Sequence, residues 1–355
     1  MTDTETAVEG RDIAIAKAGG KTWSQIGVQF GVDPERARSK FRYWRKANRD
    51  DWQSLKTTYK PEEVKPTIAG LFPSDYYPDT EQIWEQAIKA QRQTEKRQNK
   101  RMNQVIRLPG NKPVGIAFLS DAHFGSPATD YASAKADAEI IGKTAGLYAS
   151  EHGDGWDNWI VGRLQALQRV QVIGFDAERE LFFDWLSMMG DKLLWLISGN
   201  HPWWTSKLSG IDPFVQRLRG VRMLYDPHEV YVTLKLGRRS WKILARHSWR
   251  GSSIFNPTHG IEVGWERRGL DFDIGIGGHT HTGTFCREFV KHGKTRYAVQ
   301  VGTYKVNGDE YGRENGMAEP HGRGCGAMIF FPDGRLHWCS DLEMAADYLA
   351  WARAK

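Results

Sequence analysis

Cysteine is scarce in this sequence, in which only Cys286, Cys325 and Cys339 occur among 355 residues. Their number is odd, they lie far apart, and they form no CxxC pair. These features argue against a disulfide framework and against a thiolate zinc site. The simplest interpretation is a cytoplasmic protein in a reducing compartment, whose cysteines serve as packing residues.

Long apolar runs are missing as well. No stretch approaches the roughly 18 apolar residues that a membrane-spanning helix needs, so we expect no contact with a membrane. The first residues, Met-Thr-Asp-Thr-Glu-Thr, are polar and acidic, and we expect no secretory signal there. Hydrophobic residues make up 40% of the chain and charged residues 26%, which is ordinary for a globular protein with a full core.

Acidic residues are slightly outnumbered by basic ones, which gives a net charge of +6. This mild excess permits a nucleic-acid partner without requiring one. The distribution is more informative, because the positive charge clusters near the N-terminus. We predict an N-terminal helical module over residues 1–50, a linker with a charged helix over 51–112, and a main domain over 113–355.

The N-terminal module has the pattern of three short helices. An apolar helical pattern stops at a pair of glycines, and Thr22 is a plausible N-cap for a second helix that ends at Gly31. Asp33 and Pro34 then predict the start of a third helix, which we expect to reach about Asn48.

This order of helices resembles a helix-turn-helix module. Gly27, Gly31 and Val32 match the small residue, the turn glycine and the following apolar residue of that motif. The resemblance implies that the third helix enters the major groove of DNA. The alternative is a small helical cap whose basic face is solvated. The residues expected to contact DNA are basic side chains of the third helix: Arg36, Arg38, Lys40, Arg42 and Arg45.

The segment 51–112 is punctuated by prolines at positions 61, 66, 73 and 78, which predicts a linker. Within it, Thr80 to Met102 form a charged, glutamine-rich pattern that predicts a mostly polar helix. A helix of this kind is usually a spacer or lies on a surface. Its basic residues leave a second interpretation open, an arm that follows the backbone of DNA.

The main domain alternates apolar runs with helical patterns, which predicts an α/β layered fold. We expect helices over 130–144, 176–189 and 341–354. Strand candidates lie at 115–119, 193–197, 241–245, 274–276, 297–301 and 328–331. Sites in such sheets form at the carboxyl ends of the strands, so the residues that follow these runs are the candidates for a functional site.

Five short motifs follow one another along this domain, and all but the second lie at or just beyond an apolar run. Together they supply two carboxylates, one amide and several imidazoles, a set that suits Mn²⁺, Fe or Zn²⁺ better than Ca²⁺ or Mg²⁺. In extended backbone, the side chains of residues two apart lie on the same side of the chain. This would place Asp121 beside His123, and His279 beside His281. The motifs read DAH at 121–123, GDGWDN at 153–158, GNH at 199–201, a lone His247 and GHTH at 278–281.

This order of motifs resembles the calcineurin-like metallophosphoesterase superfamily, over roughly residues 114–304. The resemblance implies a four-layer α/β/β/α sandwich and two divalent metal ions, with Mn²⁺ expected and Fe or Zn²⁺ as alternatives. One ion would be held by Asp121, His123, Asp154 and His281. The other would be held by Asp154, Asn200, His247 and His279. His201 would lie near the substrate as the catalytic residue, donating a hydrogen bond to phosphate or protonating the leaving oxygen.

Some positions depart from the family pattern or leave it ambiguous. The residue after Gly-Asn-His is usually acidic and orients the histidine, whereas here it is Pro202. Asp157 and Asn158 both fit a variable position of the second motif, and each could instead orient Asp154 or its loop. The segments 199–205 and 252–260 are similar to phage or prophage members, which would place the protein in the cytoplasm of a bacterial host.

Several tryptophans lie close to the motifs. They could stack on nucleic-acid bases or pack in the core, and both interpretations stay open for Trp156, Trp159, Trp203, Trp204 and Trp249. The arginines on either side of His247, Arg246 and Arg250, could likewise contact substrate phosphate or form surface ion pairs.

The sequence leaves three functions open. A two-metal centre that activates a hydroxide cleaves phosphoesters, and the basic N-terminal module favours a DNA-directed phosphodiesterase or nuclease. The superfamily includes double-strand-break-repair nucleases with this motif order. A phosphomonoesterase or protein phosphatase is the alternative, because the same metals cleave both kinds of ester. The third is a DNA-binding protein with an inactive phosphoesterase domain, which only Pro202 favours. No oligomeric state is predicted.

Overall fold

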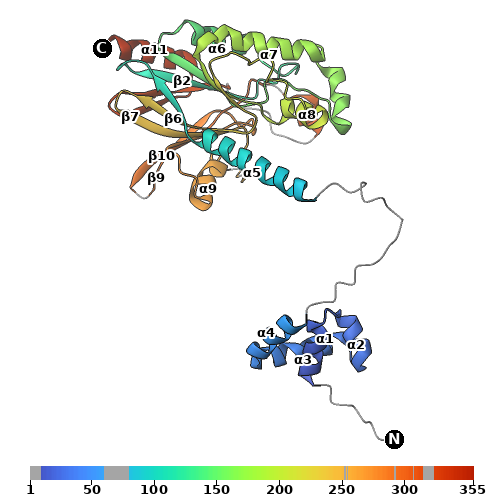
Figure 1. Ribbon diagram of the computed structural model, residues 1–355. Coiled ribbons are helices and arrows are strands. Elements are labelled where there is room, and N and C mark those ends of the chain that lie inside the picture. Colours follow the sequence, from blue (N-terminus) through green and yellow to red (C-terminus); the bar gives the residue numbers. More distant parts are fainter. Residues whose placement is uncertain are drawn as a thin grey trace. The chain divides into compact units, whose positions relative to one another are not determined.

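The structure is a computed structural model that describes residues 9–59, 80–251, 253, 255–291, 293–306, 308–314 and 324–355 (Figure 1). The four prolines of the predicted linker lie outside the described residues, as do residues 252 and 254 of the segment 252–260. The chain divides into two compact units, and the division falls between Glu85 and Gln86.

The first unit consists of four short helices, α1 (Gly10–Ala18), α2 (Trp23–Phe30), α3 (Pro34–Ala47) and α4 (Arg49–Thr58). Thr22 and Gln25 cap the start of α2 reciprocally, each side chain accepting a hydrogen bond from the other residue's backbone N–H. Asp33 caps α3. The helices share one apolar core, formed by Ile13, Ala14, Ala16, Ile26, Ala37 and Phe41.

The close approach of α2 and α3 requires glycine at two positions, Gly31 in the turn and Gly27 within α2. Gly31 has a φ of 62° in the left-handed region, which glycine adopts without steric cost. A Cβ at residue 27 would lie 2.8 Å from the carbonyl oxygen of Val32, so the helices approach this closely only because Gly27 has no side chain. Trp52 and Leu55 of α4 pack on the same core, so this unit extends past residue 50 into the predicted linker.

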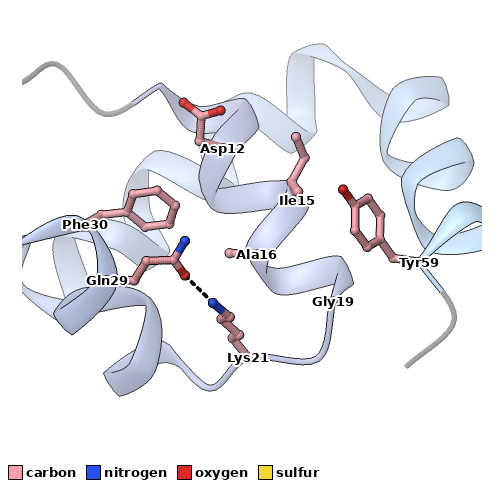
Figure 2. Close-up of a pocket in the computed structure, with 8 residues that line it drawn as sticks. All are labelled: Asp12, Ile15, Ala16, Gly19, Lys21, Gln29, Phe30 and Tyr59. Atoms are coloured by element: carbon pink, nitrogen blue, oxygen red, sulfur yellow. Dashed lines mark hydrogen bonds between the residues drawn. The ribbon is translucent and has the colours of Figure 1, made fainter. Parts of the chain in front are cut away.

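A small pocket of about 370 Å³ opens on the side of α1 that faces the end of α2 (Figure 2). The Lys21 ammonium donates a hydrogen bond of 2.7 Å to Gln29 Oε1 at its rim. No residue of α3 lines it, so it is separate from the basic helix. The lining residues are Asp12, Ile15, Ala16, Gly19, Lys21, Gln29, Phe30 and Tyr59.

The second unit contains two six-stranded mixed sheets. One has the order β12-β11-β2-β3-β4-β5, in which β2, β3 and β4 run parallel. Its strands are β2 (Val114–Leu119), β3 (Leu147–Glu151), β4 (Leu193–Ile197), β5 (Leu224–Asp226), β11 (Gly326–Phe330) and β12 (Leu336–Cys339).

The other sheet has the order β1-β6-β7-β8-β10-β9, in which β7 and β8 run parallel. Its strands are β1 (Gln104–Leu108), β6 (Glu229–Leu236), β7 (Arg239–Arg246), β8 (Ile274–Gly277), β9 (Phe285–Lys291) and β10 (Lys294–Gln300). Because β1 pairs with β6 over its whole length, the C-terminal end of the predicted linker is part of this sheet.

Helices on both sides of the second unit cover the outer faces of its two sheets (Figure 1). One apolar cluster joins the β2 sheet to α6 (Tyr131–Lys143), α7 (Phe175–Met189) and α11 (Leu342–Ala354). A second cluster, with Ile116, Trp195 and Ile243, fills the space between the sheets. A third joins the other sheet to α9 (His259–Arg268). This order of layers confirms the predicted α/β/β/α sandwich.

Helix α5 (Thr80–Met102) has the predicted bounds and no buried side chain. The remaining helical segments are α8 (Asn200–Ser209), α10 (Glu310–Glu314) and the 3-10 segments η2 (Gly162–Val170) and η3 (Gly190–Lys192). Among the helices that the structure describes, none has both the length and the apolar composition needed to cross a bilayer.

Candidate metal centre

The first motif lies in the loop after β2. The carboxylate of Asp121 is completely buried and accepts hydrogen bonds from Ser120 Oγ at 2.5 Å and from the backbone N–H of His279 at 2.8 Å. These contacts aim Asp121 Oδ1 at the His281 ring, whose Nε2 lies 3.1 Å away. A side chain at Gly278 would collide with Ser120 and Asp121, which explains the glycine that begins the last motif.

His123 completes this first group. Its Nδ1 lies 2.6 Å from Asp157 Oδ1, so this nitrogen carries the proton and Nε2 faces the interior of the centre. There Nε2 lies 3.1 Å from His281 Nε2 and 3.7 Å from Asp121 Oδ1. Three atoms that can each offer a lone pair therefore converge.

Asp154 connects this group to a second one. Its Oδ1 accepts a hydrogen bond of 2.8 Å from the backbone N–H of His201, and its Oδ2 lies 3.0 Å from His247 Nε2. Asp154 also lies within ligand distance of His123. The loop is tightly packed, because a Cβ at Gly153 would lie 2.6 Å from His247 Nδ1 and one at Gly199 would lie 2.3 Å from Asp154 Oδ1.

His247, just past β7, is the centre of the second group. Its Nδ1 lies 2.8 Å from the carbonyl oxygen of His152 and therefore carries the proton. Its Nε2 then faces Asn200 Oδ1 at 2.9 Å and His279 Nδ1 at 3.1 Å, besides the carboxylate of Asp154. Electron-rich atoms in this arrangement repel one another unless a positive charge lies among them, so the donor set fits a divalent cation.

The electrostatics of the centre lead to the same interpretation. Burial lowers the pKa of His247, but the carboxylates of Asp154 and Asp121 outweigh it and raise that pKa to about 10. Burial raises the pKa of Asp154, yet His247 and His201 hold it below its usual range. Burial also lowers the pKa of His279. The ionised carboxylates thus favour positive charge beside them.

The backbone of the centre is strained. Six non-glycine residues of the described chain have left-handed φ angles, between 48° and 72°, and all belong to the motifs: Asp121, His123, Asp154, Asn158, His279 and His281. Such residues cluster at functional sites, at a cost of about 1–3 kcal/mol each. The extended backbone predicted for the first and last motifs is therefore wrong. Loop hydrogen bonds hold the bent form instead, such as His123 N–H to the Asp154 carbonyl at 3.0 Å.

His201 lies in the first turn of α8, beside Asp154 and His123. Its Nε2 is 3.9 Å from Asp154 Oδ2. Its Nδ1 lies 2.5 Å from the carbonyl oxygen of Asp157, which takes the place of the acidic neighbour that the family pattern leads one to expect. Pro202 therefore leaves the His201 ring oriented, and a proline in a first helical turn loses no helix hydrogen bond. Burial lowers the pKa of His201 to about 4.

Asp157 and Asn158 lie behind the convergent groups. Asp157 contacts His123, and Asn158 donates hydrogen bonds to the His201 carbonyl at 2.5 Å and to Thr205 Oγ1 at 3.1 Å. Sequence reasoning did not find Ser120 or the His152 carbonyl. A serine before an aspartate is a weak signal, and a backbone oxygen leaves no signal at all.

His152 itself is buried in a structural role, its Nδ1 3.0 Å from the carbonyl of Leu119 and its Nε2 accepting from Trp195 Nε1 at 3.2 Å. Arg246 forms an ion pair with Glu229, and Arg250 is exposed. Trp156 and Trp249 pack in apolar clusters. The predicted DNA contacts all lie on α3 in the first unit, where Arg36, Arg42 and Arg45 are exposed and Arg38 and Lys40 are half-buried.

No family model and no curated protein matches the chain. Among solved structures it is similar to Vps29 of Chaetomium thermophilum, with 11% identity over 64% of this chain and 93% of that one, at a TM-score of 0.33. It is also similar to a metallophosphoesterase from Sphaerobacter thermophilus, with 14% identity over 67% and 99% of the two chains and a TM-score of 0.31. A third is the calcineurin-like phosphoesterase YfkN of Bacillus subtilis, with 12% identity over 69% and 100% and a TM-score of 0.29. Because these scores are low, a functional conclusion depends on the site itself.

Proposed function

We propose that this chain is a metal-dependent phosphoester hydrolase whose substrate is DNA. The observation that carries the proposal is the position of Asp154. A carboxylate oxygen of Asp154 lies within 4.8 Å of a ring nitrogen of His123 in one group and of ring nitrogens of His247 and His279 in the other. A carboxylate shared in this way is suited to bridge two cations.

The residues that would hold one divalent ion are Asp121, His123, Asp154 and His281. Those that would hold the other are Asp154, Asn200, His247 and His279. We expect Mn²⁺, with Fe or Zn²⁺ as alternatives, because imidazole and carboxylate ligands are mixed. Two such ions supply a water activated near neutral pH and offset the negative charge of the phosphoryl group.

The chain's own side chains position these ligands and the substrate. Asp157 holds the His123 ring, and the His152 carbonyl holds the His247 ring, so both present Nε2 to the centre. His201 lies next to Asp154 at the edge of the centre. A proton on its Nε2, in addition to the one that Nδ1 directs at the Asp157 carbonyl, would let the ring donate a hydrogen bond to a phosphoryl or leaving oxygen.

The first unit supports DNA as the substrate. Exposed positions of α3 form a strip that carries Arg36, Ser39, Arg42, Tyr43 and Lys46, and Tyr43 is 78% exposed. Basic side chains on one helix face neutralise phosphates, and an exposed polar aromatic on the same face suits the edge of a groove. A cytoplasmic location belongs to the same proposal, since all three cysteines are free thiols.

Ester specificity tests the hydrolase. The protein loaded with Mn²⁺ is given bis(p-nitrophenyl) phosphate, p-nitrophenyl phosphate, and single- and double-stranded DNA. We expect the diester and DNA to be cleaved. Asp154→Ala should abolish all hydrolysis, whereas Asp176→Ala, at an exposed position of α7, should not. Cleavage of the monoester alone would instead identify a phosphomonoesterase, and no cleavage of any ester would leave an inactive domain.

A salt titration of DNA affinity tests the basic helix in the full-length chain. Removing two phosphate contacts with Arg42→Ala and Lys46→Ala should weaken binding and reduce the slope of log K against log salt by about 2. Lys143→Ala with Arg335→Ala, which removes the same charge from exposed positions of the second unit, is the matched control. Equal slopes for the two double variants would exclude α3 as the contact surface.

A further inference from the structure

Four aromatic rings form a continuous set at one edge of the metal centre, here named the aromatic shelf: Trp159, His201, Trp204 and Tyr311. The His201 and Trp204 ring centroids are 4.3 Å apart at an interplanar angle of 31°. Trp159 contacts His201 at 4.7 Å, Trp204 at 5.9 Å and Tyr311 of α10 at 5.5 Å. Segments far apart in the sequence thus meet beside His201.

The shelf is held rigidly by the loop that orients the metal centre. Trp159 is 4% exposed, and its indole N–H donates to Asp157 Oδ2 at 3.0 Å. The backbone carbonyl of Asp157 also fixes the His201 ring. Trp204 and Tyr311 are half-buried, so the shelf has a fixed inner part and an accessible outer part.

Core packing does not account for these tryptophans. Trp156, three residues from Trp159, is 1% exposed and packs against Phe182 and Phe214 in the helical layer. Trp159 and Trp204, by contrast, belong to none of the hydrophobic clusters that the described residues of the second unit form. Their main aromatic partners are His201, Tyr311 and each other.

The position of His201 determines what would lie on the shelf. His201 Nε2 is 3.9 Å from Asp154 Oδ2, so a leaving oxygen bound at His201 is next to the centre. The group attached to that oxygen would then be next to the Trp204 ring, whose centroid is 4.3 Å from that of His201. A flat aromatic group is the chemistry that such a surface holds best.

We propose that the aromatic shelf is a stacking subsite for one nucleobase, the base of the nucleoside that leaves with the ester oxygen. The inference depends on the proposed phosphodiesterase function and specifies its substrate. A base on Trp204 has left the stack of a duplex, so the shelf selects unpaired nucleotides, in single strands or at frayed ends, over intact base pairs.

The hydrolysis test compares TpT with two analogues that each lack one base, using the Mn²⁺-loaded full-length protein. Loss of the base on the leaving side should lower kcat/KM about tenfold or more, and loss of the other base should have a smaller effect. Trp204→Ala should lower kcat/KM for TpT by a similar factor. It should have little further effect on the analogue without the leaving-side base, because the two changes remove one interaction.

Two variants serve as controls. Trp203→Ala changes the neighbouring tryptophan of α8, which packs on His228 instead, at 4.9 Å, and should behave like the wild type. Trp204→Phe keeps an aromatic ring and should recover most of the TpT activity. If TpT is cleaved but neither the missing bases nor Trp204→Ala alters kcat/KM, the subsite is disproved while the hydrolase proposal stands.

A binding measurement decides the case in which no diester is cleaved. In EDTA, thymidine 5′-monophosphate should shift the indole N–H resonance of Trp204, identified by its loss in Trp204→Ala. Ribose 5-phosphate, which lacks a base, should leave it in place. Equal responses to the two compounds, or none to either, would overturn the subsite even if the hydrolase proposal failed separately.

Discussion

Asp157 contacts three groups at the centre through three different atoms. Oδ1 is 2.6 Å from His123 Nδ1, Oδ2 accepts from Trp159, and the carbonyl oxygen faces His201. Burial raises its pKa, but Lys305 and His123 reverse this and hold the pKa below its usual value. Asp157 is therefore an ionised residue that orients a proposed metal ligand rather than a ligand itself.

We predict that Asp157→Asn weakens Mn²⁺ binding about tenfold to a hundredfold. The amide is a weaker hydrogen-bond acceptor than the carboxylate, which makes His123 Nε2 less basic, and residues of this kind typically affect metal affinity by that factor. Isothermal titration with Mn²⁺ measures the effect. Asp176→Asn on the surface of α7 is the control, and equal affinities for the two variants would contradict the orienting role.

Glu178 of α7 is a second buried acid near this loop. Burial and the nearby Asp157 raise its pKa to about 8, which backbone N–H groups of Asn158 and Asp157 only partly offset. In the folded protein this carboxyl therefore keeps its proton at neutral pH, whereas the unfolded chain releases it near pH 4.5.

The direction in which the free energy of unfolding changes with pH follows from proton binding. Between about pH 4.5 and pH 8 the folded state holds a proton that the unfolded state has lost, so the free energy of unfolding falls as pH rises. The fall is at most about 1.4 kcal/mol per pH unit. Glu178→Gln should remove this component, so that the variant gains stability relative to the wild type toward pH 8. Urea denaturation in EDTA measures the difference, and parallel pH profiles would refute it.

At the residue scale, the resemblance carried by the motifs implied which side chains converge. Asp121, His123 and His281 lie together, and Asp154, His247 and His279 form another group. The roles of Asp157 and Asn158 could not be assigned from the sequence, because either residue type fits the position. Only the three-dimensional path of the loop, with its left-handed turn at Asn158, separates their contacts.

At the scale of elements, the loop after β3 and the start of α8 form one supporting piece. The Asn158 amide joins the carbonyl of His201 to Thr205, one turn further along α8. With the hydrogen bond from His201 N–H to Asp154 and the contact of the His201 ring with the Asp157 carbonyl, this amide fixes the register of the helix relative to Asp154.

We predict that Asn158→Ala lowers kcat for a phosphodiester about tenfold, because the turn of α8 that carries His201 loses one of its anchors. The bound Mn²⁺ content should stay unchanged, because the lost amide contacts the His201 carbonyl and Thr205 and not a side chain of the proposed ligand set. Pro202→Ala, in the same turn, should leave kcat within about twofold, since the His201 ring is held by Asp157. It should lower stability by about 0.5–1 kcal/mol through the more flexible unfolded chain. Steady-state kinetics with metal analysis measures both, and a large loss in Pro202→Ala would contradict this account.

Element prediction succeeded for several apolar runs, but it missed the alternating strand β6 and a strand whose buried residues are polar. The strand Leu193–Ile197 and the helix Thr80–Met102 have the predicted bounds. The strand β3 was missed because it ends in Ser150 and Glu151, both completely buried. The buried Glu151 carboxyl accepts a hydrogen bond from the backbone N–H of Gly153. No hydropathy pattern reveals this partner.

At the scale of the whole molecule, all convergent groups lie in the second unit and none lies in the described part of the first. A ligand that binds only the folded state stabilises it, by about 2.7 kcal/mol at a hundred times its Kd. Any gain from Mn²⁺ should therefore belong to the second unit alone.

Calorimetry with Mn²⁺ or with EDTA checks this division. We expect chelation to lower the melting temperature of the second unit by about 5–10 °C and to leave the transition of the first unit unchanged. Asp154→Ala should show the lower value under both conditions. A shift of both transitions by EDTA would contradict the confinement of the metal centre to residues 121–281.

The sheet that carries Asp121 has a further consequence for the growing chain. Its strand β2 pairs on one side with β3 and on the other with β11, and β11 ends only at Phe330. The Asp121 carboxylate also accepts a hydrogen bond from the backbone N–H of His279, so both later segments must be synthesised before the centre can form. The four helices α1 to α4 of the first unit, by contrast, end at Thr58. At about 5–20 residues per second on a ribosome, the helical unit would emerge and fold on the order of ten seconds or more before the hydrolytic centre can close. Any attachment to nucleic acid would then precede the ability to cut it.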